Sequence, residues 1–294
     1  MIPFVRDLEF QYGRCDWVSP LIRRVIADNP GPFTYLGTGT YIVGQGEVAV
    51  IDPGPDLPAH LDALLAAIGD ERVTHILVTH DHADHSPLAA ALSAATGARV
   101  WGRSRRTVTQ AAGFDDDHDE AFRPDFEVRD GELFDGPGWT LEAVPTPGHT
   151  SNHVAYALRQ ENALFSGDHI MGWSTTVISP PDGNMADYFA SLERVKARGF
   201  STLWPTHGPP ITEPQPFIEA YIAHRKAREA QVLASLAQGP TTIRAMVPVL
   251  YAAVDPRLHP AAAHSLLGHV VQLVDEGRVI SDGPPGVEAT LRLA

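Results

Sequence analysis

Histidines are concentrated in one short segment of the chain. Three of them form the pattern H-x-H-x-D-H over His80-Asp81-His82-Ala83-Asp84-His85. Side chains two residues apart share a face of an extended segment, so His80 and His82 can bind one cation. As the chain turns towards the next predicted helix, Asp84 and His85 can face a second cation. The segment therefore indicates a site for more than one metal ion.

Three further candidate ligands each follow a short predicted strand. They are His149 after strand 140–144, Asp168 after strand 163–165 and His207 after strand 201–204. A small or turn-forming residue lies beside each of them, which lets the backbone bend sharply. We therefore expect the three side chains to reach the same edge of the fold as the histidine-rich segment.

The order and spacing of these residues resemble the metallo-β-lactamase fold superfamily. The resemblance covers residues 30–210 and five motifs in order, namely Asp52, segment 80–85, His149, Asp168 and His207. It implies an α/β fold, a four-layer αββα sandwich. It also implies the ligand sets: His80, His82 and His149 for a first metal, Asp84, His85 and His207 for a second, and Asp168 as the bridge between them.

The implied site performs hydrolysis. Two cations lower the pKa of water to near 7 and can receive the developing negative charge of a substrate. We predict Asp84 and Asp168 as catalytic residues in addition to their role as ligands. The single cysteine, Cys15, excludes a thiolate cluster within one chain. Imidazole with carboxylate suits two Zn²⁺ ions, and Mn²⁺ or iron is also compatible with this donor set.

Other residues near the motifs are predicted to support the site or to be structural. Asp52 is expected to act through hydrogen bonds rather than as a ligand. His75 is interpreted as a packed strand residue. His153, four residues after His149, could support a ligand, but a plain strand role is preferred. His169, next to Asp168, is a candidate to orient a ligand or donate a proton. The remaining histidines are interpreted as structural: His60, His118, His224, His259, His264 and His269.

Hydrophobic periodicity predicts the elements that position these residues. Strands are expected at 47–51, 73–79, 140–144, 154–158 and 163–165, and helices at 58–68, 86–96 and 185–198. The second helix is expected to bury Leu88, Ala91, Leu92 and Ala95. Several strands follow one another directly while others alternate with helices, so the sheets should be mixed, with helices outside them.

The chain is predicted to divide into a catalytic domain, 1–213, and a C-terminal domain, 214–294. The first part holds 15 basic and 29 acidic residues and the second holds 7 of each, so the whole net charge of −14 belongs to the first. Helices at 217–237, 242–253 and 260–276, followed by a short hairpin, indicate a small winged-helix-like domain. Arg225, Lys226 and Arg228 on its first helix are interpreted as a solvated basic face.

Composition narrows the class of protein. Hydrophobic residues make up 44% of the chain and charged residues 20%, values typical of a folded globular protein. No apolar run approaches the roughly 20 residues of a membrane helix, and Arg6, Asp7 and Glu9 interrupt any signal-peptide core. We expect a cytoplasmic protein without a membrane partner, and we allow for a homodimer. The net charge of −14 makes double-stranded DNA an unfavourable partner.

Two substrate classes are compatible with the sequence. The chain is similar to the lactamase-β-2-like group, which implies cleavage of single-stranded RNA, with Arg103, Arg105 and Arg106 as candidate phosphate contacts. The alternative is a thioesterase, glyoxalase II-like, or a hydrolase of another small ester or lactone. In that case the loop 173–181 and the C-terminal domain would form an apolar pocket wall, with Trp173 and Trp204 near the metals. A DNA-binding regulator is disfavoured because the C-terminal part is neutral.

Overall fold

Two β-sheets stacked face to face form the centre of the protein. The computed structural model describes residues 2–105 and 117–294. The first sheet contains, in spatial order, β1 (Cys15–Trp17), β2 (Ile22–Ile26), β3 (Gly39–Gln45), β4 (Glu47–Ile51), β5 (Arg72–Leu77), β6 (Arg99–Gly102) and β7 (Phe126–Glu127). The second contains β12 (Thr202–Pro205), β11 (Ala163–Gly167), β10 (Val154–Leu158), β9 (Trp139–Pro145) and β8 (Leu133–Gly136).

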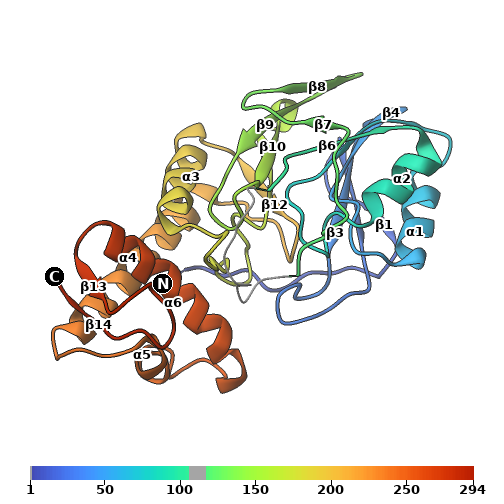
Figure 1. The fold of residues 1–294 in the computed structure, drawn as a ribbon. Coiled ribbons are helices and arrows are strands. Elements are labelled where there is room, and N and C mark those ends of the chain that lie inside the picture. Colours follow the sequence, from blue (N-terminus) through green and yellow to red (C-terminus); the bar gives the residue numbers. More distant parts are fainter. Residues whose placement is uncertain (1, 106–116) are drawn as a thin grey trace.

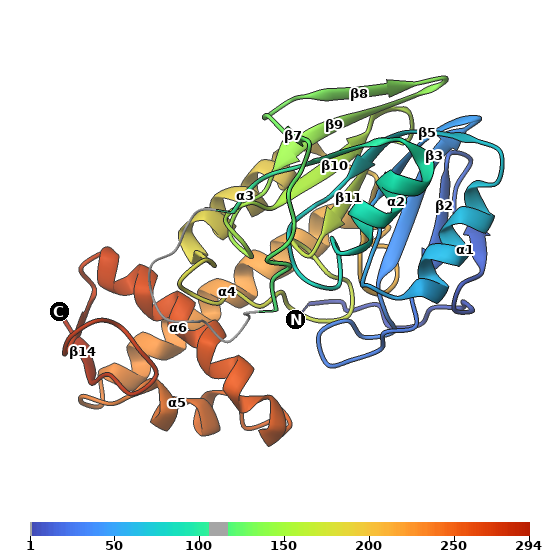
Figure 2. The same cartoon turned by 45° about the vertical axis from the view of Figure 1, so that its right-hand side comes forward.

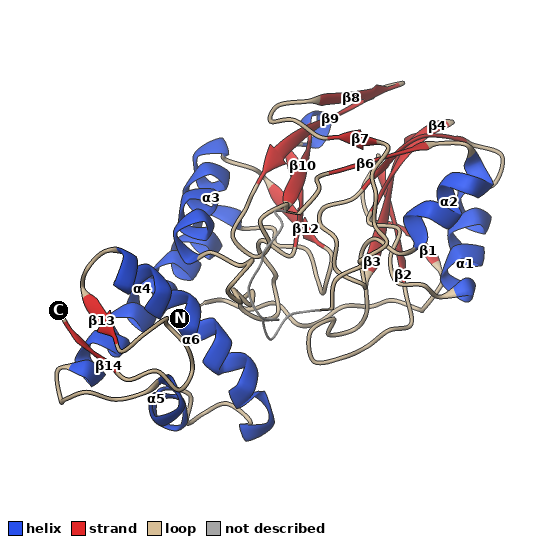
Figure 3. Ribbon diagram, in the orientation of Figure 1, coloured by secondary structure: helices blue, strands red, loops and turns tan. Residues whose placement is uncertain are grey.

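Helices cover the outer faces of both sheets (Figure 1). α1 (Pro58–Ile68) and α2 (Leu88–Thr96) lie on the first sheet, and α3 (Met185–Arg198) lies on the second. The pairs β4–β5, β5–β6, β6–β7 and β11–β12 are parallel and the others antiparallel. Figure 3 shows the strands gathered between the helices. This arrangement confirms the predicted αββα sandwich and its mixed sheets.

Alternation of side chains along each strand separates three apolar layers. In β10, Val154, Tyr156 and Leu158 enter the core between the two sheets, whereas Ala155 and Ala157 face α3. This is the period of two that a strand buried on both faces requires. Trp204 on β12 also lies in the core between the sheets, with its ring 6.2 Å from that of Tyr41. Trp204, which the sequence analysis places near the metals, is thus a core residue of the strand that precedes His207.

Most of the predicted elements are present with small changes at their ends. The predicted strands 47–51 and 154–158 and the helix 58–68 have the same bounds in the structure. The strand predicted to reach residue 79 ends at Leu77, because the chain turns there towards the next loop. In α2, Ala95 is exposed and Ala89 is buried instead, so one position of the predicted apolar face was wrong.

The C-terminal part is a helical module with a small hairpin. It consists of α4 (Pro214–Leu236), α5 (Ile243–Leu250) and α6 (His259–Asp275), followed by β13 (Val279–Ser281) paired with β14 (Leu291–Leu293). The described residues also contain two short 3₁₀ helices. One, Pro256–Leu258, lies in the C-terminal part, and the other, Arg159–Glu161, lies between β10 and β11. No helix in the two described ranges is long and apolar enough to span a membrane.

Helix α4 belongs to two cores at once (Figure 2). Phe217, Ile218 and Tyr221, near its start, pack with α3 against the second sheet, whereas Val232 and Leu236, near its end, pack with α5 and α6. A helix that is part of both cores couples the module to the sandwich.

Two side chains of α4 also hold the backbone of a loop that follows β11. Tyr221 donates its hydroxyl proton to the carbonyl oxygens of Met171, at 3.0 Å, and Ser174. Arg225 donates to the carbonyl oxygen of Thr176 and is only 3% exposed. The prediction that Arg225 belongs to a solvated face was therefore wrong. Its neighbour Lys226 is exposed.

Replacing Arg225 should uncouple the loop from α4. In Arg225→Met the carbonyl oxygen of Thr176 loses a charged donor in a buried position, which should lower the free energy of unfolding by about 2–3 kcal/mol. Urea unfolding followed by circular dichroism measures this change. Lys226→Met, one residue further along the same helix, is the matched control and should stay within about 0.5 kcal/mol of the original protein. Equal stability of both variants would contradict the role given to Arg225.

Candidate metal centre

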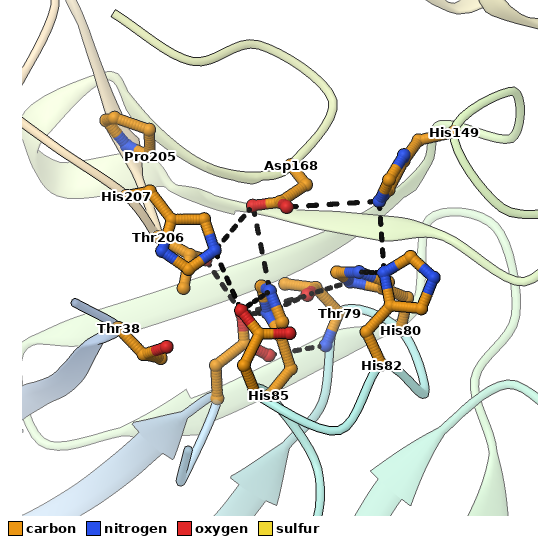
Figure 4. Close-up of polar contacts among 12 residues, drawn as sticks. Thr38, Thr79, His80, His82, His85, His149, Asp168, Pro205, Thr206 and His207 are labelled. Carbon is orange, nitrogen blue, oxygen red and sulfur yellow. Dashed lines mark hydrogen bonds and ion pairs between the residues drawn. The ribbon is translucent and has the colours of Figure 1, made fainter. Parts of the chain in front are cut away.

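Candidate ligands from four loops meet at one end of the sandwich (Figure 4). The loops follow β5, β9, β11 and β12, and Asp52 follows β4. Because β4 and β5 are parallel, and β11 and β12 are parallel, each pair presents its carboxyl ends at one edge of its sheet. The structure brings all seven predicted ligands together at this end.

The first group consists of three imidazoles. The His82 Nδ1 atom lies 2.8 Å from the His80 Nε2 atom and 3.2 Å from the His149 Nε2 atom. All three residues are buried and are close enough to hold a single cation. They come from two segments, the loop after β5 and the loop after β9.

The second group combines a carboxylate with two imidazoles. The Asp84 Oδ2 atom lies 3.0 Å from the His207 Nε2 atom and 3.5 Å from the His85 Nε2 atom. These three residues also satisfy the geometry required for one cation. Each group therefore has three donors that converge.

Asp168 lies between the two groups. Its Oδ1 atom is 3.4 Å from His207 Nε2 and 3.7 Å from His85 Nε2, whereas its Oδ2 atom is 3.9 Å from His149 Nε2. One carboxylate oxygen thus faces each group, as Figure 4 shows. This is the placement required of a carboxylate shared between two cations.

The buried carboxylate of Asp52 connects three of the segments that form the site. It accepts hydrogen bonds from the Thr79 backbone N–H, at 2.7 Å, and the Thr79 hydroxyl, at 2.8 Å. It also accepts from the Thr206 hydroxyl and from His85 Nδ1, both at 2.9 Å. The backbone of Asp52 has a φ of 49°, which turns the chain sharply at the end of β4. The predicted supporting role of Asp52 is confirmed by these contacts.

Backbone carbonyls orient two further imidazoles. His149 Nδ1 donates to the Val177 carbonyl at 2.7 Å, and His207 Nδ1 donates to the Gly37 carbonyl at 3.2 Å. A proton held on Nδ1 leaves the lone pair of Nε2 directed into the site. His85 achieves the same orientation through its hydrogen bond with Asp52.

Electrostatics divide the site into neutral and charged parts. Burial, reinforced by neighbouring histidines, holds the pKa of His80 and His82 well below the ordinary value. Burial would raise the pKa of Asp84 and Asp168, but the adjacent imidazoles outweigh it and lower both. Burial would likewise lower the pKa of His85, but Asp84, Asp168 and Asp52 raise it well above its usual range. The carboxylates are therefore ionised.

The donor set fits cations. His85 Nε2 and Asp168 Oδ1 are buried and have no hydrogen-bond partner among the described residues. Buried polar atoms without partners are costly, and converging nitrogen lone pairs repel one another unless a cation lies between them. Five imidazoles and two carboxylates are donors that divalent transition metals accept.

Two histidines interpreted as structural lie directly beside the ligands. His153 Nε2 accepts a hydrogen bond from the backbone N–H of Asp168 at 3.1 Å, and its Nδ1 interacts with Thr146 Oγ1 at 2.8 Å. The interpretation of His153 as a plain strand residue was therefore wrong. Gly167 is required at this contact, because it has a φ of +52° and a Cβ there would lie 2.6 Å from His153 Nε2.

His118, which the sequence analysis interprets as structural, also lies beside the candidate ligands. Its Nδ1 lies 3.2 Å from Asp81 Oδ1, and its ring centroid lies 4.6 Å from that of His82. It comes from a segment 36 residues beyond His82, and nothing in its local sequence distinguishes it from a surface histidine. By contrast, His75 packs against Phe134 and Trp139, as predicted.

His169 does not fit the predicted role of proton donor. The side chain is fully buried and neither ring nitrogen has a hydrogen-bond partner in the described part of the chain. Burial lowers the pKa of His169 to about 3, so the ring is neutral at neutral pH. Its backbone carbonyl accepts hydrogen bonds from Tyr188 and Thr176, which makes the residue part of the loop's framework.

Comparison with known proteins establishes the family. The sequence pattern of the metallo-β-lactamase superfamily matches residues 35–207, and that of the β-lactamase-associated winged helix domain matches residues 242–286. The first match covers more than half of the chain, so the protein belongs to the metallo-β-lactamase superfamily. The resemblance inferred from the motifs is confirmed, as is the C-terminal winged helix.

More specific likenesses come from individual proteins. The chain is 32% identical over 278 residues to the atrochrysone carboxyl ACP thioesterase nsrC of Aspergillus novofumigatus (strain IBT 16806), covering 89% of this chain and 81% of that protein. It is 32% identical over 220 residues to the β-lactamase-like protein 2 homolog of Caenorhabditis elegans, covering 74% and 71%. The crystal structure of a β-lactamase domain protein from Burkholderia ambifaria has a TM-score of 0.81 at 22% identity, covering 100% and 97%. The last likeness shows that the whole fold is shared.

Removing one donor of the first group should abolish one metal site. His82→Ala takes away one of three converging nitrogens, so the affinity for the first metal ion should fall at least about hundredfold. Elemental analysis after dialysis should then find one ion fewer per chain, with an unchanged circular dichroism spectrum. His259→Ala in the C-terminal module is the control and should keep the full content. Full metal content in His82→Ala would exclude His82 as a ligand.

Asp52→Asn should lower the metal affinity of the site although it replaces none of the seven candidate ligands. The Asn side chain has an N–H group in place of one carboxylate oxygen. This N–H group faces at least one of the four hydrogen-bond donors that now converge on Asp52, so His85 loses its fixed orientation. Metal affinity, measured by competition with a chelator, should fall about 10- to 100-fold. The exposed Asp56→Asn is the matched control. Identical affinities for both variants would show that Asp52 does not position the site.

Proposed function

We propose that this protein is a binuclear metal-dependent hydrolase that cleaves thioesters. The observation that carries the proposal is the carboxylate of Asp168, which faces both groups of donors, one oxygen to each. Membership of the superfamily supports hydrolysis as the reaction class. The proposal adds the role of each residue and the substrate.

The seven side chains would divide the metals between them. His80, His82 and His149 would hold one cation, Asp84, His85 and His207 the other, and Asp168 would contact both and reduce their repulsion. Two divalent cations supply Lewis acidity and lower the pKa of water to near 7. Zn²⁺ is the metal we propose, and Mn²⁺ or iron would suit the same donors.

The protein contributes orientation and a dry environment. In thioester hydrolysis, a C–O bond forms between water and the acyl carbon, the C–S bond breaks, and a proton passes from water to the leaving thiolate. Asp84, which is partly exposed, and Asp168, which is buried, are both ionised, so they can accept hydrogen bonds from water and fix its direction. The buried hydrogen bonds of Asp52 keep the ligands in place.

Three observations favour a thioester over RNA. The Aspergillus relative is named as an acyl carrier protein thioesterase, and its alignment covers 89% of this chain. An apolar pocket lies beside the loop that carries Val177, whose carbonyl orients His149. Arg105, a candidate phosphate contact, forms ion pairs with Asp81 and Glu120. Arg106 lies outside the described residues, and Arg103 is half-buried.

A direct comparison of substrates tests the proposal. The Zn²⁺-loaded protein is given an acyl thioester of N-acetylcysteamine and, in parallel, a fluorescent single-stranded RNA at low salt. We expect release of free thiol from the first substrate, at least hundredfold above that of His82→Ala, and no cleavage of the second. RNA cleavage that His82→Ala abolishes, with no thiol release, would contradict the proposal and establish the ribonuclease alternative. The cytoplasmic location expected from the sequence, and the homodimer that it allows, stay predictions.

A further inference from the structure

A pocket lies between the loop after β11 and the C-terminal module. It contains about 830 Å³ of empty space, part of it open to solvent. Apolar and aromatic side chains form most of its wall: Phe33, Met171, Trp173, Tyr251, Val254 and Leu258. Concave sites with mostly apolar walls and a few polar groups bind small organic molecules.

The wall of this pocket is continuous with the supports of the metal centre. Val177 lines the pocket, and its carbonyl oxygen accepts the proton of His149 Nδ1. The ring of Trp173 stacks on Tyr35 at 4.7 Å and lies against Gly208, where a Cβ would be 3.0 Å from it. Gly208 directly follows His207. A molecule in the pocket would therefore contact Val177 and Trp173, which in turn contact His149 and the residue after His207.

The polar part of the pocket is cationic. Arg225 and Arg228 line it, and no Asp or Glu occurs among its described lining residues, although the chain has a net charge of −14. His224 lines it too, but burial lowers the pKa of this histidine to about 4, so its ring is neutral. Arg225 is already bound to the Thr176 carbonyl and to Ser265 Oγ. The pocket therefore has the opposite charge character to the protein as a whole, which favours an anionic ligand.

Arg228 is the cation that remains available. Its guanidinium lies 3.9 Å from the centroid of the Tyr251 ring. Its Nη1 atom donates to Gln231 Oε1 and to the Leu250 carbonyl. In the described part of the structure its Nε and Nη2 atoms have no acceptor, so they can form a bidentate pair with a carboxylate. The contact with the Tyr251 ring restricts the movement of the guanidinium group.

We propose that this pocket binds the acyl part of the substrate and selects an aromatic acyl group that carries a carboxylate. The aromatic walls bury the rings, and Arg228 pairs with the carboxylate. The thioester carbon, at the other end of the acyl group, lies towards the metal centre. This inference rests on the proposed thioesterase function and adds the chemical class of the acyl group.

Acyl thioesters of graded size test the pocket. The substrates are the acetyl, 2-naphthoyl and 6-carboxy-2-naphthoyl thioesters of N-acetylcysteamine, and the measurement is kcat/KM. Ala261, half-buried on the pocket wall, is replaced in Ala261→Trp to fill the space. This change should lower kcat/KM for both naphthoyl substrates at least tenfold more than for the acetyl one. Ala234→Trp, at an exposed position of α4, is the matched control and should not alter the ratio.

A second variant, at Arg228, tests whether its positive charge selects a carboxylate, and its result is independent of that of Ala261→Trp. Arg228→Gln should lower kcat/KM for the carboxynaphthoyl thioester at least tenfold more than for the plain naphthoyl thioester. Arg244→Gln, at an exposed arginine outside this pocket, is the control. Circular dichroism verifies that each variant is folded.

The outcomes separate this inference from the function on which it rests. If the wild-type protein hydrolyses none of the three thioesters, the proposed function is wrong and the inference falls with it. If it hydrolyses them but neither variant changes the preference among acyl groups, only the inference is overturned. A changed size preference with an unchanged preference for the carboxylate would contradict the role of Arg228.

Discussion

The carboxylate of Asp52 is the interaction on which the arrangement of the site depends. It lies at the end of β4, is 1% exposed, and accepts four hydrogen bonds from Thr79, Thr206 and His85. These partners belong to the loops after β5 and β12, so one charge connects the first sheet to the second. A buried carboxylate is stable only when it is fully paired, and here the pairing itself sets the geometry. Ligands from separate sheets meet because their loops share this acceptor.

The C-terminal module also helps to position the candidate ligands, because α4 binds the loop that follows β11. Tyr221 and Arg225 of α4 bind backbone carbonyls between residues 171 and 176. That segment lies between Asp168, which faces both donor groups, and Val177, whose carbonyl orients His149. The winged helix is therefore part of the framework of the loop after β11, and the pocket that we propose for the acyl group lies between them.

The sequence predicted that the seven candidate ligands converge and that Asp52 supports them, but it did not predict the contacts of His118 or the burial of Arg225. The pattern H-x-H-x-D-H is local, and strand ends place His149, Asp168 and His207 by simple topology, so periodicity and spacing were sufficient. The position of His153, four residues after His149, allowed a supporting role, whereas His118 has no local signal, because its contact with Asp81 depends on how distant segments pack. Arg225 lies in a run of charges that favours a solvated face, and only the docking of α4 buries it. Trp204 follows the alternation of β12 into the core, which a four-residue strand did not reveal.

The central claim is that Asp168 is shared by two metal ions. X-ray diffraction from crystals of the metal-loaded protein, measured at the absorption edge of the bound metal, tests it most directly. The account predicts two anomalous peaks about 3.5–4 Å apart, one among His80, His82 and His149 and one among Asp84, His85 and His207, each bonded to one oxygen of Asp168. A single peak, or two peaks of which only one contacts Asp168, would contradict it.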